Sequence, residues 1–144
     1  MWSYVRTSCS PFDGGKDVRM NLKKQVEEIV GPYDSYPLEC DGLTRVAAYL
    51  LRMADVPHKT FVGEVVFKGK VFAPHYWIEL ETREILDYRL RMWFGDDAPH
   101  GVFKPKKNDV EYVGLHMDIG ATKTMFDILT RFIGGSDVGE GTGS

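Results

Sequence analysis

The stretch that decides the fold is residues 40–54, which read CDGLTRVAAYLLRMA. Its apolar residues recur three or four positions apart, so they form one stripe along a helix. The stripe consists of Leu43, Val46, Ala47, Leu50, Leu51 and Ala54. Pro57 follows closely and ends the pattern. We therefore predict a helix from Cys40 to Ala54 at the centre of the core.

After Pro57 the apolar residues alternate with polar ones, which is the period of a β-strand. The alternation covers three segments, Thr60–Phe67, Val71–Leu80 and Glu84–Leu90, separated by two short polar turns. Short turns join antiparallel neighbours. The sequence therefore predicts a three-stranded antiparallel meander.

A helix is predicted on each side of this central part. The first runs from Val18 to Val30, with Asp17 as its N-cap. The last runs from Ala121 to Ile133, where apolar residues recur at helical spacing and two glycines follow.

The remaining segments complete the predicted fold. Asp96–Asp109 is rich in proline, glycine and charge, which predicts a loop, and a short strand is predicted at Val110–Leu115. The order helix, helix, sheet, helix is typical of the α+β class. We expect one domain over residues 1–133 and a flexible tail over residues 134–144, which contain five glycines.

Composition narrows the classes of function. The 144 residues are 43% apolar and 27% charged, as in an ordinary globular domain. The 18 basic and 21 acidic residues leave a formal charge of −3, so no positive field exists to hold a nucleic acid. Neither a signal peptide nor an apolar run of the ~18 residues that a membrane span needs is evident. We expect a cytoplasmic protein without nucleic-acid or membrane partners.

No metal or cofactor is expected. His58, His100 and His116 lack the close spacing of a zinc site, and no glycine-rich phosphate loop is evident. The two cysteines, Cys9 and Cys40, are expected to be free thiols, because a reducing compartment and a sufficient core favour that state.

Three residues could carry chemistry. Cys40 begins the central helix, where unpaired backbone N–H groups and the helix dipole favour an anion such as a thiolate. Alternation along the second strand places His75, Trp77 and Glu79 on one face, and Asp87 lies in the next strand. If the helix packs with its amino end over that face, Cys40, His75 and Asp87 form a nucleophile, a base and an orienting carboxylate.

Each of these residues also has a purely structural interpretation. Cys40 would be a small buried residue at a helix start, since free cysteine is among the most buried residue types. His75 would be a hydrogen-bonded strand histidine, and Asp87 would pair with Arg89 or Arg91.

A family resemblance favours the catalytic interpretation. The run Cys40-Asp41-Gly42-Leu43-Thr44 resembles the nucleophile helix of the transglutaminase-like branch of the papain-like cysteine protease superfamily. His75-Tyr76-Trp77-Ile78-Glu79 resembles the His-x-Trp-x-Glu strand of that family, and Ile85-Leu86-Asp87 resembles the strand that ends in its triad aspartate. The motifs follow in the family's order over Leu38–Leu90, about a third of the chain.

The resemblance implies an α+β papain-like core, with the nucleophile helix packed on an antiparallel sheet, and a triad of Cys40, His75 and Asp87. It implies a cysteine-dependent acyl-transfer enzyme that acts on amide bonds of a protein or peptide. We favour water as the acyl acceptor, as in a protease, amidase or deamidase, because the short chain has little room for calcium sites or accessory domains. The alternatives are transglutaminase-type transfer to an amine and a catalytically silent papain-like binding module.

The sequence departs from the family pattern around the nucleophile. Glu39 and Asp41 flank Cys40, where a small residue is common before the cysteine, and two carboxylates oppose a thiolate. Activation is therefore expected to depend on His75. The Cys40 N–H is a candidate oxyanion donor, and the sequence does not rank the candidate side chains for the second donor. These are Trp2, Gln25, Tyr33 and Tyr36.

Overall fold

The computed structural model of the protein describes residues 15–131, with side chains from residue 22 onward. The elements are α1 (Gly15–Val30), η2 (Gly31–Tyr33), α2 (Cys40–Met53), β1 (His58–Phe67), β2 (Lys70–Leu80), β3 (Ile85–Asp87), α3 (Leu90–Phe94), β4 (Gly101–Phe103), η3 (Lys106–Asn108) and β5 (Val110–His116). A further helical stretch covers residues 123–131. None of the helices in this range is long and apolar enough to cross a membrane.

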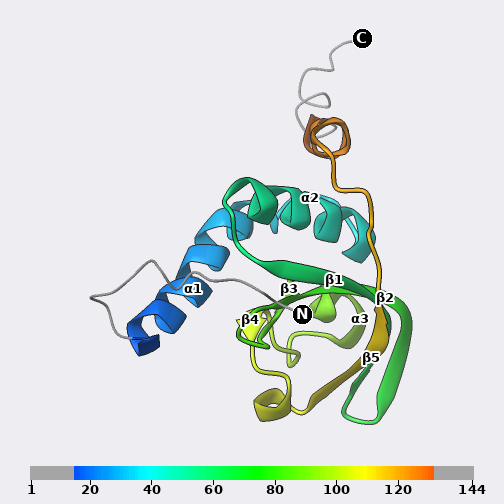
Figure 1. Cartoon of the computed structure of the whole chain (residues 1–144). Coiled ribbons are helices and arrows are strands. Elements are labelled where there is room, and N and C mark those ends of the chain that lie inside the picture. The colour runs from blue at the N-terminus through cyan, green and yellow to red at the C-terminus, as the bar shows by residue number, and fades with distance from the viewer. Residues whose placement is uncertain (1–14, 132–144) are drawn as a thin grey trace.

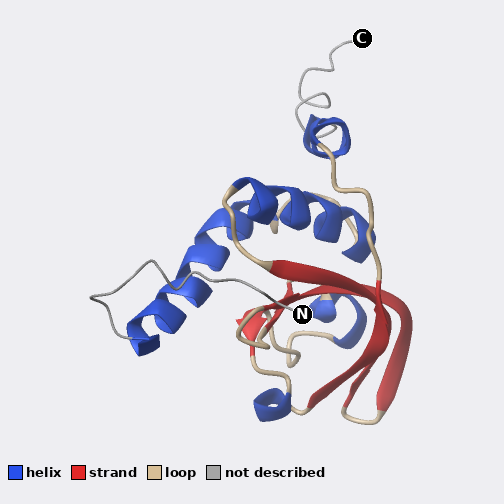
Figure 2. Cartoon of the chain, in the orientation of Figure 1, coloured by secondary structure: helices blue, strands red, loops and turns tan. Residues whose placement is uncertain are grey.

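The five strands form one antiparallel sheet in the order β4-β3-β2-β1-β5. The predicted meander is its centre, and β4 and β5 are added at the two edges. Helix α2 lies above the sheet, α1 runs beside it on the side of β4, and α3 lies within the curve of the sheet (Figures 1 and 2). The α+β prediction, with helices packed on an antiparallel sheet, is therefore confirmed.

The second half of β2, from His75 to Leu80, contributes buried side chains to both faces of the sheet. Ile78 and Leu80 pack with Leu51 of α2 in the core beneath the helices. Trp77 lies in a second core cluster with Leu90 of α3. His75 has the same parity as Trp77 and is likewise buried. The side chains of β2 thus divide between two cores.

Helix α1 covers the outer edge of β4 with a pair of charged side chains. Lys23 Nζ donates to the Val102 carbonyl at 2.9 Å, and Glu27 Oε2 accepts the Val102 N–H at 3.0 Å. The two side chains also pair with each other at 3.0 Å. Together they satisfy the backbone groups that a free edge would expose. Gly101 permits the approach, because a Cβ there would lie 2.7 Å from Glu27 Oε2.

The predicted helix bounds are close to the observed ones. Helix α2 ends at Met53, one residue before the predicted end. Helix α1 begins at Gly15, so Asp17 lies inside the helix rather than at its N-cap. The last helical stretch starts after Thr122, whose Oγ1 accepts the Met125 N–H at 3.1 Å. Its predicted end and the glycine-rich tail 134–144 lie outside the described residues.

Two segment predictions are wrong. The strand predicted at Glu84–Leu90 covers only Ile85–Asp87. It stops there because Asp87 Oδ1 accepts the Arg89 N–H at 2.9 Å and the chain then turns into α3. The loop predicted at Asp96–Asp109 contains β4, a strand of three residues, which is too short to show a period.

Strands β1 and β5 approach each other most closely at two paired glycines. Gly63 lies opposite Gly114, and a Cβ on Gly63 would lie 2.2 Å from the Val113 carbonyl oxygen. A Cβ on Gly114 would lie 2.4 Å from the Val62 oxygen and 2.7 Å from Trp77 Cη2. Only glycine fits at either position.

Gly114→Ala is therefore expected to lower the free energy of unfolding by about 1–3 kcal/mol, the usual cost of forcing an atom into a filled site. Gly42→Ala in α2 is the control. Its Cβ would meet the flexible Leu38 side chain at 3.3 Å, and alanine favours a helix over glycine by ~1 kcal/mol. Urea unfolding measures both variants, and equal losses would contradict the close approach.

Candidate active site

Cys40 is the first residue of α2 and a free thiol that is only 6% exposed. Glu39 precedes the helix in extended conformation and makes no capping bond with its side chain. The Asp41 carboxylate instead accepts the Gly42 N–H at 2.8 Å and lies 3.6 Å from Arg45 Nη1. The carboxylate beside Cys40 is thus held by the helix start and partly neutralised by an arginine.

His75 and Asp87 form a buried pair on neighbouring strands. His75 Nε2 and Asp87 Oδ2 are 2.7 Å apart, with side chains 0% and 2% exposed. Oδ2 also accepts the Tyr112 hydroxyl at 2.7 Å, and Oδ1 accepts the Arg89 N–H at 2.9 Å. Glu79 lies beyond Trp77 along the strand, with Oε2 3.8 Å from Arg83 Nη1. The structure therefore brings His75 together with Asp87.

The thiol of Cys40 also acts on the imidazole of His75. Burial by itself lowers the pKa of His75, but the charge and hydrogen bond of Asp87 outweigh it, and the hydrogen bond and charge of Cys40 add to them. The net result raises this pKa from 6.5 to about 9. Within the described part of the chain, Nδ1 is buried and has no hydrogen-bond partner. Nδ1 is therefore the ring nitrogen left open to a further group, and catalytic hydrogen bonds are often formed only when substrate binds.

The helix reaches His75 in a way that the sequence did not predict. The body of α2 packs over Ile78, on the sheet face opposite to His75. Strand β3 pairs only with Ile78 and Glu79 of β2 and then ends, so β2 has no strand partner beside His75 on that side. Cys40, Tyr76 and Asp87 line one small cavity of about 10 Å³ there. The end of the helix thus meets the imidazole beside the sheet rather than over the expected face.

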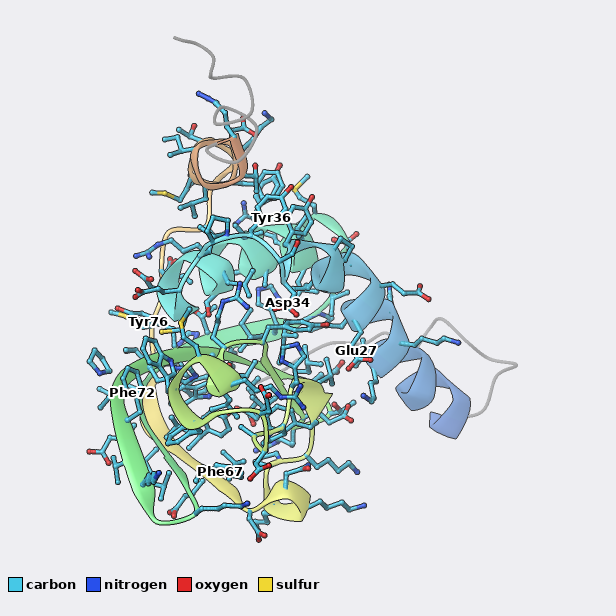
Figure 3. The ribbon with its side chains drawn as sticks, turned by 180° about the vertical axis from the view of Figure 1, so that it is seen from behind. Glu27, Asp34, Tyr36, Phe67, Phe72 and Tyr76 are labelled. Atoms are coloured by element: carbon cyan, nitrogen blue, oxygen red, sulfur yellow. The ribbon has the colours of Figure 1, made fainter. Side chains whose placement is uncertain are left out.

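Figure 3 shows this region from behind, with Tyr76 below the end of α2 and Phe72 farther along β2. The Phe72 ring stacks on Trp93 with centroids 4.0 Å apart and meets the His75 ring edge-on at 6.1 Å. The rings of Trp77 and Tyr112 lie roughly parallel to the imidazole, with centroids 6.1 and 6.5 Å from it. Aromatic rings therefore line the buried His75.

Sequence reasoning missed two residues of the site. Tyr112 lies in the predicted last strand, but nothing in the sequence shows that this strand pairs with β1 and brings a phenol to Asp87. Burial and the Asp87 charge raise the pKa of Tyr112 well above 10.0, so its hydroxyl remains a donor. Arg89 was expected only as an ion-pair partner of Asp87. Its guanidinium instead binds the segment before Cys40, and only its backbone N–H binds Asp87.

The candidate oxyanion donors lie in different places. Trp2 lies outside the described residues, and Gln25 is exposed on α1. Tyr33 and Tyr36 contact each other with ring centroids 5.1 Å apart, in the segment that leads to Cys40. The Tyr36 carbonyl is bound by Arg89. Tyr36 is therefore the candidate whose backbone is tied to the site.

No group of three metal-ligating side chains lies close enough to hold an ion within the part of the chain that the structure describes. His100 bonds to Asp34 at 2.8 Å. His58 bonds to the Val56 carbonyl at 2.8 Å, and burial lowers its pKa.

Comparison with known proteins gives no match: no family model, curated protein or solved structure is significantly similar to the chain.

The raised pKa of His75 predicts a pH dependence of stability. The pKa is about 9 in the folded protein and near 6.5 when unfolded, so the stabilisation is complete below pH 6.5 and is lost as pH rises through 9. The free energy of unfolding should fall across this window by up to about 3 kcal/mol.

Urea unfolding at a series of pH values measures this fall, and Asp87→Asn is the control. Without the carboxylate charge, burial of His75 dominates and the fall should disappear. The same slope in both proteins would show that other groups cause it.

Proposed function

We propose that the protein is a cysteine-dependent acyl-transfer enzyme with a papain-like, transglutaminase-like core, acting on amide bonds of a protein or peptide. The observation that carries the proposal is the placement of His75, whose Nε2 is bound to Asp87. Cys40 lines a cavity together with Asp87 and is close enough to raise the pKa of the imidazole further. A thiol, an imidazole and a buried carboxylate in this order are the parts of a cysteine triad.

The geometry supports the following first step. With its pKa at about 9, His75 is mostly protonated at neutral pH, so Nδ1 can hold the proton that leaves the Cys40 thiol. The sulfur attacks the amide carbonyl carbon, and the developing negative oxygen lies toward the Cys40 N–H. Nδ1 then gives its proton to the departing amine as the carbon–nitrogen bond breaks. An acyl-thioester on Cys40 remains.

The second step consumes the thioester. Neutral His75 takes a proton from water as the water oxygen attacks the acyl carbon, and the carbon–sulfur bond breaks to release an acid. Asp87 accepts the Nε2–H throughout, which keeps the lone pair of Nδ1 directed at the reacting atoms. A primary amine in place of water would give transglutamination by the same residues.

A protein or peptide substrate is supported by the surface beside the site. Leu115 of β5 and Tyr76 of β2 both lie opposite Val62 of β1, so one cross-strand row leads from the edge of the sheet to the cavity at Cys40. Leu115 is 75% exposed, and β5 is an edge strand of the described sheet. An extended peptide can pair with such an edge and place apolar side chains on such a row.

The proposal predicts the reactivity of Cys40. Iodoacetamide at about pH 6 should alkylate Cys40 at least about tenfold faster than it alkylates glutathione, because the thiolate is stabilised by His75. His75→Ala and Asp87→Asn should each remove most of this advantage. Glu79→Gln is the matched control and should change the rate by less than about twofold, since Glu79 lies beside Arg83.

Peptide mapping by mass spectrometry distinguishes Cys40 from Cys9, the only other cysteine of the sequence. If Cys40 is inert in the folded protein while Cys9 reacts, the silent binding module becomes the better interpretation. If Glu79→Gln is the more damaging change, the assignment of the carboxylate is wrong.

The acyl acceptor is tested with a denatured, glutamine-rich protein, with and without a fluorescent primary amine. We expect cleaved or deamidated products that mass spectrometry detects equally in both reactions, and little amine adduct. Cys40→Ala should abolish them, because thioester formation needs the sulfur. Amine adducts as the main product would instead indicate a transglutaminase.

A further inference from the structure

We propose that Arg89 is the positioning residue of this site, holding the segment before Cys40 with its side chain and Asp87 with its backbone. The inference rests on the proposed function and names how the nucleophile and the carboxylate are fixed relative to each other. Arg89 is not itself a catalytic residue, because its guanidinium binds the segment before Cys40 and the Tyr88 carbonyl rather than the imidazole.

The guanidinium of Arg89 uses all five of its N–H donors. Nε donates to the Leu38 carbonyl at 2.6 Å, and Nη2 donates to the carbonyls of Asp34 and Tyr36 at 2.9 and 3.1 Å. Nη1 donates to the Asp34 carboxylate at 2.7 Å and to the Tyr88 carbonyl at 2.9 Å. Three carbonyls of the segment that ends at Cys40 are therefore bound by one side chain.

The backbone of Arg89 binds the carboxylate of Asp87. The Arg89 N–H donates to Asp87 Oδ1 at 2.9 Å, while Oδ2 binds His75 and Tyr112. The carboxylate is thereby held by both oxygens and cannot rotate away from the imidazole. Arg89 thus joins the residues before the nucleophile to the residue that orients the base.

This link matters because the two halves of the site come from separate elements. Cys40 lies at the end of α2, and its distance from His75 depends on the path of the preceding segment rather than on the strand register. Figure 3 shows Asp34 and Tyr36 near the end of α1, on the approach to α2. An error of about 1 Å in such a position can cost about a hundredfold in rate. A buried fork of five donors fixes that path.

Arginine suits the task for a chemical reason. Its planar fork binds several carbonyls at fixed angles, whereas a lysine ammonium is a single point with three donors. Arg89 is only 7% exposed, so carbonyls that lose it would be left without a donor in a buried place. Lysine is therefore expected to restore part of the positioning, and methionine none of it.

The test measures the rate of Cys40 alkylation by iodoacetamide from about pH 5 to pH 9 for the full chain. Arg89→Met should lower the rate near pH 6 by at least about tenfold and move the pH profile towards that of a free thiol, near ~8.5. Arg89→Lys should lose about threefold to tenfold in the same direction. Circular dichroism and thermal melting show whether each variant is folded.

Arg91→Met is the matched control. Arg91 lies two residues farther on, is exposed, and donates from Nε to the Ala98 carbonyl at 2.7 Å rather than to a carbonyl before Cys40. Arg91→Met should leave the pH profile of Cys40 alkylation unchanged. A variant that only lowers the stability of the fold should also leave this profile unchanged.

The outcomes separate this inference from the proposed function. If wild-type Cys40 reacts no faster than glutathione, the proposed function fails. If it reacts fast, and a folded Arg89→Lys or Arg89→Met keeps the wild-type rate and profile, the positioning role is overturned while the triad stands. Where Arg89→Met does not fold, the profile of Arg89→Lys decides alone.

Discussion

The structure depends most on the hydrogen bond between His75 and Asp87, buried in the centre of the sheet. Removing one partner of a buried charged pair costs about 3–5 kcal/mol, a large share of the ~5–15 kcal/mol by which a domain is stable. The buried pair is therefore stable only when the other acceptor positions of the Asp87 carboxylate also receive hydrogen bonds. The Tyr112 hydroxyl and the Arg89 N–H donate these hydrogen bonds. The position of β5, which carries Tyr112, and the turn from β3 into α3, which carries Arg89, are therefore both tied to the Asp87 carboxylate.

The early end of β3 is what opens the site. A longer strand would continue beside His75 and Tyr76 and would close the sheet there with another row of backbone bonds. Because Asp87 ends the strand, the segment that enters α2 takes the free place, and Cys40 meets the imidazole beside the sheet. In the proposed mechanism, the sheet thus supplies the base and the carboxylate on rigid strands, and the helix supplies the nucleophile at its amino end.

Sequence patterns predicted the parts of this fold that repeat over many residues. The apolar stripe of α2 extends over about three helical turns, and the predicted alternation of β2 extends over five pairs of residues. The helix and the strand that they predicted were both confirmed. Strand β4 was missed because three residues carry no period, and its edge is covered by Lys23 and Glu27 from a helix far away in sequence. Neither a strand of three residues nor its cover by a distant helix produces a recognisable pattern in the local sequence.

The site divides in the same way. The likeness of three short motifs singled out Cys40, His75 and Asp87. The structure pairs His75 with Asp87 and places Cys40 on a cavity that Asp87 also lines. Tyr112 and Arg89 could not be identified from motifs, because their contacts depend on the order of the strands and on the path of residues 34–39. A chemical group can be read from a motif, but the bonds that hold it in place come from parts of the chain that meet only in the folded protein. The relative positions of Cys40, His75 and Asp87 therefore depend on residues that belong to none of the motifs.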